Sequence, residues 1–336
     1  MPPKGKGKAA AAKPKEGKEV DPSVEHAKAF FKRYAASSAA HGLDELPLPK
    51  GDGTAGFARL AVHPEMGCAC MPGPSHVRAL AEALHGYSHL LTLAFWSVDV
   101  RDEGAAILAS FLLTGAGRSV QRLELTSCGV GEHGCKALGE MLVRNVGLRR
   151  LNLECNAIGT AGANLLGAGM RVNRAMQELA IPYCGLGADA GEALVGGVMR
   201  NATLEHLELR GNALGPTLVA QVLGVAAKHG SLFHLGLADT GYGLEPEVSA
   251  ALIGCASTNR GVQEYDLRGC QIGDQTAYRL VQIAKKESHI IELQLTEHLD
   301  KDLFKQALDV AANNRKDWLK KRKKGKKGGG KKGKKK

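Results

Sequence analysis

Apolar and polar residues alternate in short runs that recur at a nearly fixed spacing along most of the chain. The run VQRLELTSCGVG begins at Val120 and returns as LRRLNLECNAIG, MQELAIPYCGLG, LEHLELRGNALG, LFHLGLADTGYG and VQEYDLRGCQIG. The first residues of these runs lie 28, 28, 28, 28 and 30 positions apart, and IIELQLTEH follows after another 28. Such a period predicts one structural unit that repeats along the chain.

Each unit contains one predicted strand and one predicted helix. Leu123 and Leu125 alternate with polar residues, which is the period of a strand, whereas Leu138, Met141 and Leu142 recur at helical spacing. Neither element can bury its apolar side alone, so neighbouring units must stack strand beside parallel strand and helix beside helix. Weaker copies, FARLAV and SHLLTLAFW, precede the clear ones.

The consensus L-x-x-L-x-L-x-x-(C/N)-x-(L/I/V)-G resembles the leucine-rich repeat family, in its long ribonuclease-inhibitor type, across roughly residues 57–311. The resemblance implies an α/β solenoid shaped like a horseshoe, with a parallel sheet on the concave face and helices on the convex face. In that family, the Cys or Asn of the consensus hydrogen-bonds the backbone of neighbouring loops. This role would account for Cys128, Cys184, Cys270, Asn156 and Asn212.

Composition divides the chain into four expected parts. Residues 1–19 form a basic, disordered tail, and residues 20–56 form a capping helix with a linker, because Asp21-Pro22 fits a helix N-cap and first helical position. Residues 57–314 hold the repeats, and residues 315–336 form a second basic tail rich in Lys and Gly. We expect the last helix to continue to Lys324 and the chain beyond it to be disordered.

The net charge of +11 belongs to the two tails. Residues 1–19 carry +4 and residues 315–336 carry +13, which leaves −6 for residues 20–314. A lysine-rich segment of this kind attracts anionic surfaces without sequence specificity. The residues expected to bind a polyanion are Lys320, Lys321, Arg322, Lys323, Lys324, Lys326 and Lys327.

Three anionic surfaces fit the tails: nucleic acid, an acidic membrane, and an acidic protein polymer such as a microtubule. The tails lack the aromatic residues common in RNA-binding segments, and no lipidation signal or amphipathic anchor accompanies them. The start MPPKGKGK and the Lys/Gly end are similar in composition to proteins of the axoneme of cilia and flagella. We therefore expect a cytoplasmic, cytoskeletal protein of the axoneme, with tubulin or another axonemal subunit as the partner of the tails.

Alternatives remain open at this point. The run KKRKK can act as a nuclear import signal. The second hypothesis is therefore a nuclear or nucleolar protein whose tails bind RNA or DNA. GTPase-activating proteins of the Ran type share this kind of repeat, but that family ends in an acidic stretch where this chain has lysines. Ribonuclease inhibitors are Cys-rich and strongly acidic, unlike this chain.

The sequence has few motifs that could bind a cofactor or carry out catalysis. The segment GVGEHG, residues 129–134, fits the dinucleotide motif G-x-G-x-x-G, but Gly131 recurs in register as Gly159, Gly187, Gly215 and Gly273. We interpret these glycines as turn residues that permit conformations closed to other residues, and we predict no cofactor. No hydrolase, metalloprotease or P-loop motif is present, so the chain is predicted not to be an enzyme.

One segment outside the repeats has metal-ligating residues. Cys68 and Cys70 lie in EMGCACMPGPSH between His63 and His76, and two thiols with two imidazoles could bind zinc. The C-x-C spacing is tighter than the usual pair, and an irregular loop explains the segment as well. We therefore predict no metal site.

The strand positions between the buried leucines should face the concave side, where solenoids commonly bind protein partners. Mixed charge interrupted by aromatic residues is typical of such a surface. The residues predicted to bind a protein are Phe95, Arg122, Glu124, Arg150, Asn152, Glu154, Glu178, Tyr183, Glu208, Arg210, Phe233, His234, Asp266 and Arg268.

Overall fold

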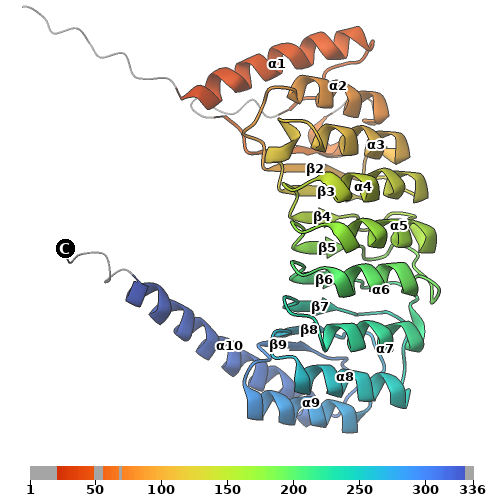
Figure 1. Cartoon of the computed structure of the whole chain (residues 1–336), viewed down its shortest axis with the longest axis vertical. Coiled ribbons are helices and arrows are strands. Elements are labelled where there is room, and N and C mark those ends of the chain that lie inside the picture. The colour runs from red at the N-terminus through yellow and green to blue at the C-terminus, as the bar shows by residue number, and fades with distance from the viewer. Residues whose placement is uncertain (1–20, 49–55, 68–69, 330–336) are drawn as a thin grey trace, which may run out of the picture.

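The computed structural model describes residues 21–48, 56–67 and 70–329. Nine parallel strands form one open sheet in which each strand lies beside its neighbours in sequence order. The sheet lines one side of an arc and helices cover the other side (Figure 1). The predicted α/β horseshoe, with its sheet on the concave face, is confirmed.

The repeat register sets the pairing of the strands. Leu123 pairs with Leu151, Leu151 with Leu179 and Leu179 with Leu207, so equivalent leucines form continuous buried rows. Inward leucines alternate with outward polar residues because successive strand side chains point to opposite faces. The strands are β1 (Arg59–Val62), β2 (Thr92–Trp96), β3 (Arg122–Thr126), β4 (Arg150–Asn152), β5 (Glu178–Ala180), β6 (His206–Glu208), β7 (His234–Gly236), β8 (Glu264–Asp266) and β9 (Glu292–Gln294).

One helix follows each strand and packs its apolar stripe onto the sheet. In the unit of β3, for example, Leu138, Met141 and Leu142 are buried. No described helix has the length and apolarity needed to cross a membrane. The helices are α1 (Pro22–Ala40), α2 (Pro74–Leu84), α3 (Arg101–Leu112), α4 (Glu132–Arg144), α5 (Gly159–Val172), α6 (Gly191–Arg200), α7 (Gly215–Ala226), α8 (Pro246–Thr258), α9 (Asp274–Glu287) and α10 (Lys301–Gly329).

Helix α1 closes the N-terminal end of the stack. Asp21 caps it by accepting a hydrogen bond from the Ser23 N–H at 2.8 Å, and proline occupies the first helical turn. Phe30 is fully buried, with its ring centroid 5.1 Å from that of Phe57. A helix thus lies where the sequence predicts one, at Pro22–Ala40, whereas the basic segment 1–19 lies outside the described residues.

A ladder of Cys and Asn side chains joins the loops that follow the strands. The Asn156 Oδ1 accepts hydrogen bonds from the N–H groups of Cys128 and Val130, both at 3.0 Å, and its Nδ2 donates to the Leu153 carbonyl at 2.7 Å. The Cys128 thiol donates to the Phe95 carbonyl at 3.2 Å. The role expected for these residues is confirmed.

A second ladder, at the ends of the helices, has no counterpart among the sequence predictions. Asn145, Asn173 and Asn201 each donate a hydrogen bond to a carbonyl at the end of the helix in the preceding unit. Each also accepts one from a backbone N–H at the start of the strand run that follows it. His229 replaces Asn in the next unit. Its Nε2 lies 3.1 Å from the Val198 carbonyl, and its Nδ1 lies 3.1 Å from the Leu232 N–H.

Helices α4, α5 and α6 approach one another more closely than α6 and α7 do. Glycines permit this approach, since a Cβ on Gly169 would stand 2.5 Å from the Gly139 carbonyl oxygen of the neighbouring helix. A Cβ on Gly139 would likewise stand 2.5 Å from the Leu165 carbonyl oxygen. The backbones of adjacent units are therefore in direct contact on the convex side.

The turn glycines correct one prediction in part. Gly159 and Gly215 have positive φ values of 63° and 71°, as expected. Gly131 and Gly273 have φ values of −115° and −70°, which other residues also adopt. The left-handed conformation lies mainly at another repeat position, in the loop that follows the strand, where Ser127, Cys155 and Tyr183 have φ values of 53° to 56°.

Helix α10 continues to Gly329, so the prediction of disorder beyond Lys324 is wrong for residues 325–329, and residues 330–336 lie outside the described part of the chain. Its N-terminal half packs on α9 and β9, with Leu303, Ala307 and Ala311 buried. Once a helix is anchored in this way, each further residue that is ordered adds one backbone hydrogen bond, so the helix can extend into the lysine-rich segment. The helix leaves the lower end of the arc on the side of the sheet (Figure 1).

Candidate functional site

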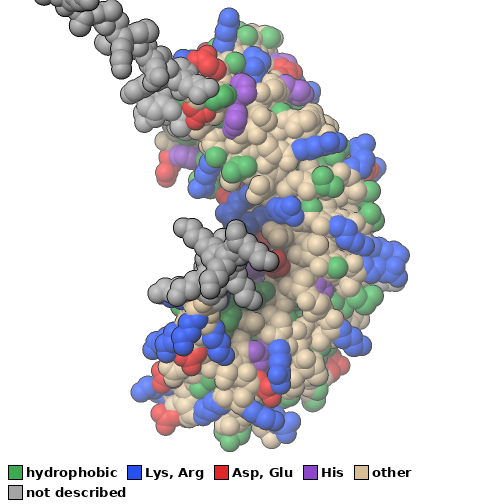
Figure 2. Space-filling view, turned by 60° about the vertical axis from the view of Figure 1, so that its left-hand side comes forward, with side chains coloured by type: hydrophobic (Ala, Val, Ile, Leu, Met, Phe, Trp, Pro, Cys, Tyr) green, Lys and Arg blue, Asp and Glu red, His purple; other side chains and the backbone are tan. Residues whose placement is uncertain are grey.

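Three positions of every unit project from the sheet into the hollow of the arc. The first includes Arg122, Arg150, Glu178, His206, His234, Glu264 and Glu292, which pair in register from strand to strand. The second includes Glu124, Asn152, Glu208 and Asp266, and the third includes Trp96, Glu154, Arg210 and Arg268. Figure 2 shows this hollowed side, with Lys and Arg side chains gathered about its middle.

The structure places most of the predicted concave residues on this face. Arg268 is exposed on it, Tyr183 is exposed beside it, Phe233 lies at its edge, and Asp266 is largely covered by Arg268. The partly or fully exposed members are Arg122, Glu124, Arg150, Asn152, Glu154, Glu178, Tyr183, Glu208, Arg210, Phe233, His234 and Arg268.

The prediction for Phe95 is wrong. Phe95 pairs in register with Leu125 and is 1% exposed, so it is a core residue. The side chain that β2 contributes to the concave face is that of Trp96, whose Nε1 donates to Glu124 at 3.1 Å. The run LLTLAFW has apolar residues, Ala94 and Trp96, at two of its outward positions, so its register is apparent only after alignment on Leu93.

The part of this face formed by β3, β4 and β5 carries two arginines, each paired with a carboxylate. Arg122 pairs with Glu124 at 3.3 Å and Arg150 with Glu178 at 3.4 Å. Arg122 and Arg150 also line a shallow hollow together with Arg149. Arginine side chains that are already held by carboxylates present an ordered set of donors to a partner.

Tyr183 follows β5 and contacts Arg210, which follows the next strand, β6. Its ring is 46% exposed, and the Arg210 guanidinium lies 5.6 Å from the ring centroid. Arg210 also pairs with Glu154 at 3.7 Å. An exposed aromatic ring with a cation over its face is typical of a protein-binding surface.

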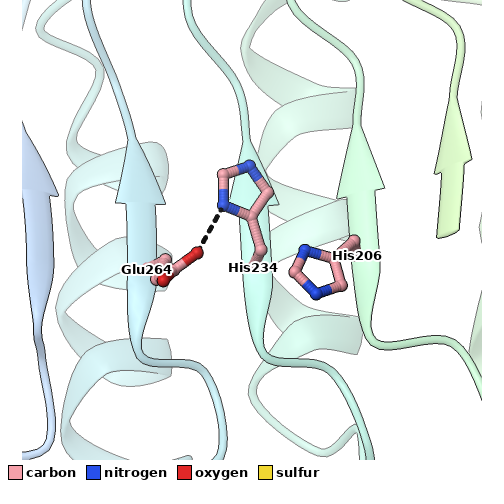
Figure 3. A group of neighbouring side chains, drawn as sticks. All are labelled: His206, His234 and Glu264. Carbon is pink, nitrogen blue, oxygen red and sulfur yellow. Dashed lines mark hydrogen bonds and ion pairs between the residues drawn. The ribbon is translucent and has the colours of Figure 1, made fainter. Parts of the chain in front are cut away.

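Histidines and carboxylates dominate the part formed by β6, β7 and β8. His234 lies between two carboxylates, with its Nδ1 3.2 Å from Glu264 and its Nε2 3.5 Å from Glu208. Burial opposes protonation, but these two partners raise the pKa of His234 to about 9. Burial, followed by the neighbouring His234, lowers the pKa of His206. The two rings are stacked at 5.6 Å between centroids (Figure 3).

Helix α10 covers the end of the concave face that lies beyond β6, β7 and β8. The Arg315 guanidinium pairs with Glu292 at 3.1 Å, and the Trp318 ring centroid lies 6.2 Å from that of Phe233. A cavity of about 670 Å³ lies between α10 and β9, lined in part by Leu293 and Phe304. One of the predicted binding residues, Phe233, therefore already has a contact within the chain.

The predicted polyanion-binding residues lie on the projecting part of α10. Lys320, Lys321, Lys323 and Lys324 are exposed, and the Arg322 guanidinium lies 4.4 Å from the Trp318 ring centroid. Lys326 and Lys327 continue the helical backbone, but their side chains lie outside the described set. Since successive helical residues are about 100° apart, five cations in a row surround the helix with positive charge.

The segment GVGEHG does not present a free phosphate site. The Gly131 N–H, at the start of α4, donates to Asp102 at 2.6 Å, so a carboxylate occupies the helix N-terminus where a phosphate would lie. The ladder thiols are equally unsuited to catalysis. Burial raises the pKa of Cys128 to about 11 and that of Cys184 to about 12, which keeps both protonated.

The loop with the two neighbouring cysteines is described only in part, because Cys68 lies outside the described residues. The Cys70 Sγ lies 3.8 Å from the His76 Nε2. His63 instead lies near the Trp96 ring, at 6.2 Å between centroids. The described residues therefore do not bring the four proposed ligands together.

A different group of metal-ligating residues, missed at the sequence level, lies on the concave face. His206, His234 and Glu264 each offer one ligand atom, and these atoms all lie within 4.8 Å of one another. The signal was available, because the three residues occupy the same position of consecutive units. Each residue type occurs singly in its unit, so a search for short ligand spacings does not find it.

A family model described as "Leucine Rich repeat" matches residues 145–167 and 200–217, so the chain contains leucine-rich repeats. No curated protein matches the chain. One similar solved structure is "Leiomodin-1 Actin-Binding Site 2 (ABS2)", with a TM-score of 0.34 and 18% identity over 41% of this chain and 78% of that chain.

Another similar solved structure is the "Crystal structure of TLR13-ssRNA13 complex", with a TM-score of 0.36 and 16% identity. That likeness covers 68% of this chain and 29% of the other chain. Similarities of this size assign neither an activity nor a partner.

Proposed function

We propose that this protein is a non-catalytic interaction scaffold that binds a protein partner on its concave face and an acidic polymer through its C-terminal helix. The observation that carries the proposal is the separation of the two surfaces. The concave face holds charges of both signs that are mostly paired, whereas Lys320, Lys321, Arg322, Lys323 and Lys324 are consecutive cations on a projecting helix, of which Lys320 pairs with Asp317 at 2.9 Å.

The polymer that we propose is the microtubule of the ciliary or flagellar axoneme. Its acidic tubulin tails complement a helix that is positive on all sides, and a multivalent polymer repeats the weak contact many times. Each cation in such a contact contributes little alone, but several act together and their effect falls with added salt. The similarity in composition to axonemal proteins supports the same choice.

The experiment is microtubule co-sedimentation of the full chain between about 50 and 200 mM salt. One variant changes the five residues 320–324 to Gln, which retains good helix formers while removing five charges. Its matched control changes Lys32, Lys136, Lys228, Lys285 and Lys286 to Gln, which removes the same charge from exposed positions outside α10. We expect the first variant to bind at least about tenfold more weakly and to lose most of its salt dependence.

Equal binding by the two variants would exclude the helix as the contact. A second test uses microtubules whose tubulin tails have been removed, on which the wild-type chain should bind as weakly as the first variant. The basic run also fits a nuclear import signal, and filter binding to mixed RNA at matched salt separates the two proposals. Tighter binding to RNA than to microtubules would favour a nuclear or nucleolar protein.

The concave face is tested by capture of partners from ciliary extract. The double variant Arg150→Glu and Arg210→Glu reverses two charges inside the hollow. Its control, Arg171→Glu with Arg200→Glu, makes the same change on the exposed parts of α5 and α6. A partner of the concave face should be lost with the first variant and kept with the second, and loss with both would point to a general effect of charge.

A further inference from the structure

Three potential metal ligands lie side by side on the concave face. His206 of β6, His234 of β7 and Glu264 of β8 pair in register across three neighbouring strands, so their side chains project from the same row. One ligand atom from each lies within 4.8 Å of the other two. In Figure 3 the His234 ring stands between the other two side chains.

These separations are close to those that a zinc ion requires. Zinc holds His nitrogen and carboxylate oxygen at about 2.0–2.2 Å in a tetrahedron, which places neighbouring ligand atoms about 3.4 Å apart. The His234 Nδ1 and the Glu264 carboxylate are already 3.2 Å apart. His206, whose ring is stacked on that of His234 at 5.6 Å between centroids, has to turn about its χ angles to bring one nitrogen to this spacing.

Glu208 gives His234 the support that a metal-ligating histidine usually has. It lies 3.5 Å from the His234 Nε2, on the nitrogen that does not face Glu264. Its own Oε1 accepts the Arg210 N–H at 3.0 Å, which fixes the carboxylate. A carboxylate on the outer nitrogen orients the ring and increases its strength as a ligand.

Gly236 makes room for this support. A Cβ at that position of β7 would collide with the Glu208 carboxylate, which lies across the strand. Every other strand from β3 to β9 carries a side chain at the equivalent position, from Glu124 to Gln294. Because Gly236 has no side chain, the Glu208 carboxylate can lie across β7 and reach the His234 ring.

We propose that His206, His234 and Glu264 form a zinc site on the concave face, with Glu208 as the outer partner of His234. Two histidines and one carboxylate leave the fourth position of the ion open toward the hollow of the arc. Water fills this position in the free protein, and a carboxylate, imidazole or thiolate of a bound protein can replace it. The site stands on different residues from the polymer-binding helix, so either proposal can fail alone.

Calorimetric titration of Zn²⁺ into the tag-free full chain tests the site. The background carries Cys68→Ser, Cys70→Ser and Cys155→Ser, which removes the cysteine pair and the exposed thiol of Cys155 as competing ligands. We expect one ion per chain with a Kd of about 10 μM or tighter. His206→Gln and His234→Gln should each weaken binding at least tenfold, and Glu208→Gln should weaken it by a smaller factor.

His133→Gln serves as the matched control, because His133 is 88% exposed on the helical side and should not affect binding. Substitution with Co²⁺ gives an independent signature, namely visible absorption of a tetrahedral ion without a thiolate charge-transfer band. Circular dichroism verifies that each variant is folded. The proposal is overturned by a Kd weaker than about 100 μM, or by equal affinities of the wild-type chain, His206→Gln and His234→Gln.

Discussion

The two halves of the concave face share one backbone and differ in chemistry. At the first outward position, β3 and β4 carry Arg122 and Arg150, whereas β6, β7 and β8 carry His206, His234 and Glu264. The first half is open to solvent, and α10 covers the end of the second half through Arg315 and Trp318. A partner that spans the arc therefore meets arginine–carboxylate pairs at one end and histidine–carboxylate pairs at the other.

The difference shows how a repeat separates folding from recognition. The buried leucine rows and the two ladders recur in both halves, so they specify the same fold throughout. The outward positions contribute little to the core, so each unit can carry a different residue there. The loop ladder differs in one unit of the second half, where Thr240 takes the place that Cys or Asn holds in the neighbouring units.

The largest expected effect concerns the aromatic pair of β2 in the first half. Phe95→Ala should lower the free energy of unfolding by about 4 kcal/mol, because it removes a fully buried ring from the core. Trp96→Ala should cost about 1 kcal/mol, since Trp96 is partly exposed and loses one hydrogen bond. Urea unfolding followed by circular dichroism measures both, and similar losses would contradict the placement of Phe95.

The next effect compares the loop ladder between the halves. Asn156→Ala should lower the free energy of unfolding by about 3 kcal/mol, because two buried N–H groups and the carbonyls that it joins lose their partner. Thr240→Ala removes the hydrogen bond that the Thr240 hydroxyl donates to the Leu237 carbonyl at 2.7 Å, and should cost about 1 kcal/mol. Equal losses in the same urea experiment would show that both halves depend on the ladder alike.

A smaller effect concerns the cover over the second half. Trp318→Ala should weaken the docking of α10 on Phe233 by about 1 kcal/mol, so that trypsin cleaves after residues 320–324 several times faster. Leu319→Ala is the matched control, because Leu319 is 45% exposed on the same turn. Identical cleavage rates for the two variants would show that the ring contact does not hold the helix.

The smallest effect is a pH dependence at the helix ladder. Burial lowers the pKa of His229, so the unfolded chain takes up a proton near pH 6.5 before the folded chain does. The stability associated with neutral His229 is therefore present above about pH 6.5 and is lost as the pH falls. His229→Asn restores the residue of the other units and should unfold at nearly the same urea concentration at about pH 7.5.

At about pH 5.5 the His229→Asn variant should be more stable than the wild-type chain. His234→Gln is the informative comparison, because the pKa of His234 is raised to about 9. Its contribution is fully present below pH 6.5 and disappears as the pH rises through about 9. If both variants changed the urea midpoint in the same pH direction, the assignment of His229 as a neutral ladder residue would be untenable.

The fold was predictable because the repeat supplies the same information many times. Each unit independently indicates one strand and one helix, and the 28-residue spacing sets the register of Leu123, Leu151 and Leu179. Phe95 was misplaced where this redundancy ends, in a weak unit without alternation. The extension of α10 was missed because composition describes an isolated segment, whereas the helix propagates from packed residues such as Ala311.

The candidate sites were predictable in location but not in chemistry. Alternation indicated which side chains enter the hollow, and it included His234 and Glu208 for that reason. It could not indicate that Gly236 lets Glu208 reach beneath His234, because this contact depends on the spacing of side chains between strands. The helix ladder of Asn145, Asn173 and Asn201 is periodic and could have been found by extending the alignment upstream.

The glycine contacts among α4, α5 and α6 have a consequence for the width of the horseshoe's mouth. In a solenoid, the bend per unit follows from how much farther apart the outer layer is spaced than the inner one. Gly139 and Gly169 allow neighbouring helices of the outer layer to lie close together, which makes the bend per unit small. Bulkier residues at these positions would push the helices apart and bend the arc more sharply. Substitutions on the back of the molecule could thus tune which partners fit its inner wall without altering a single contacting side chain.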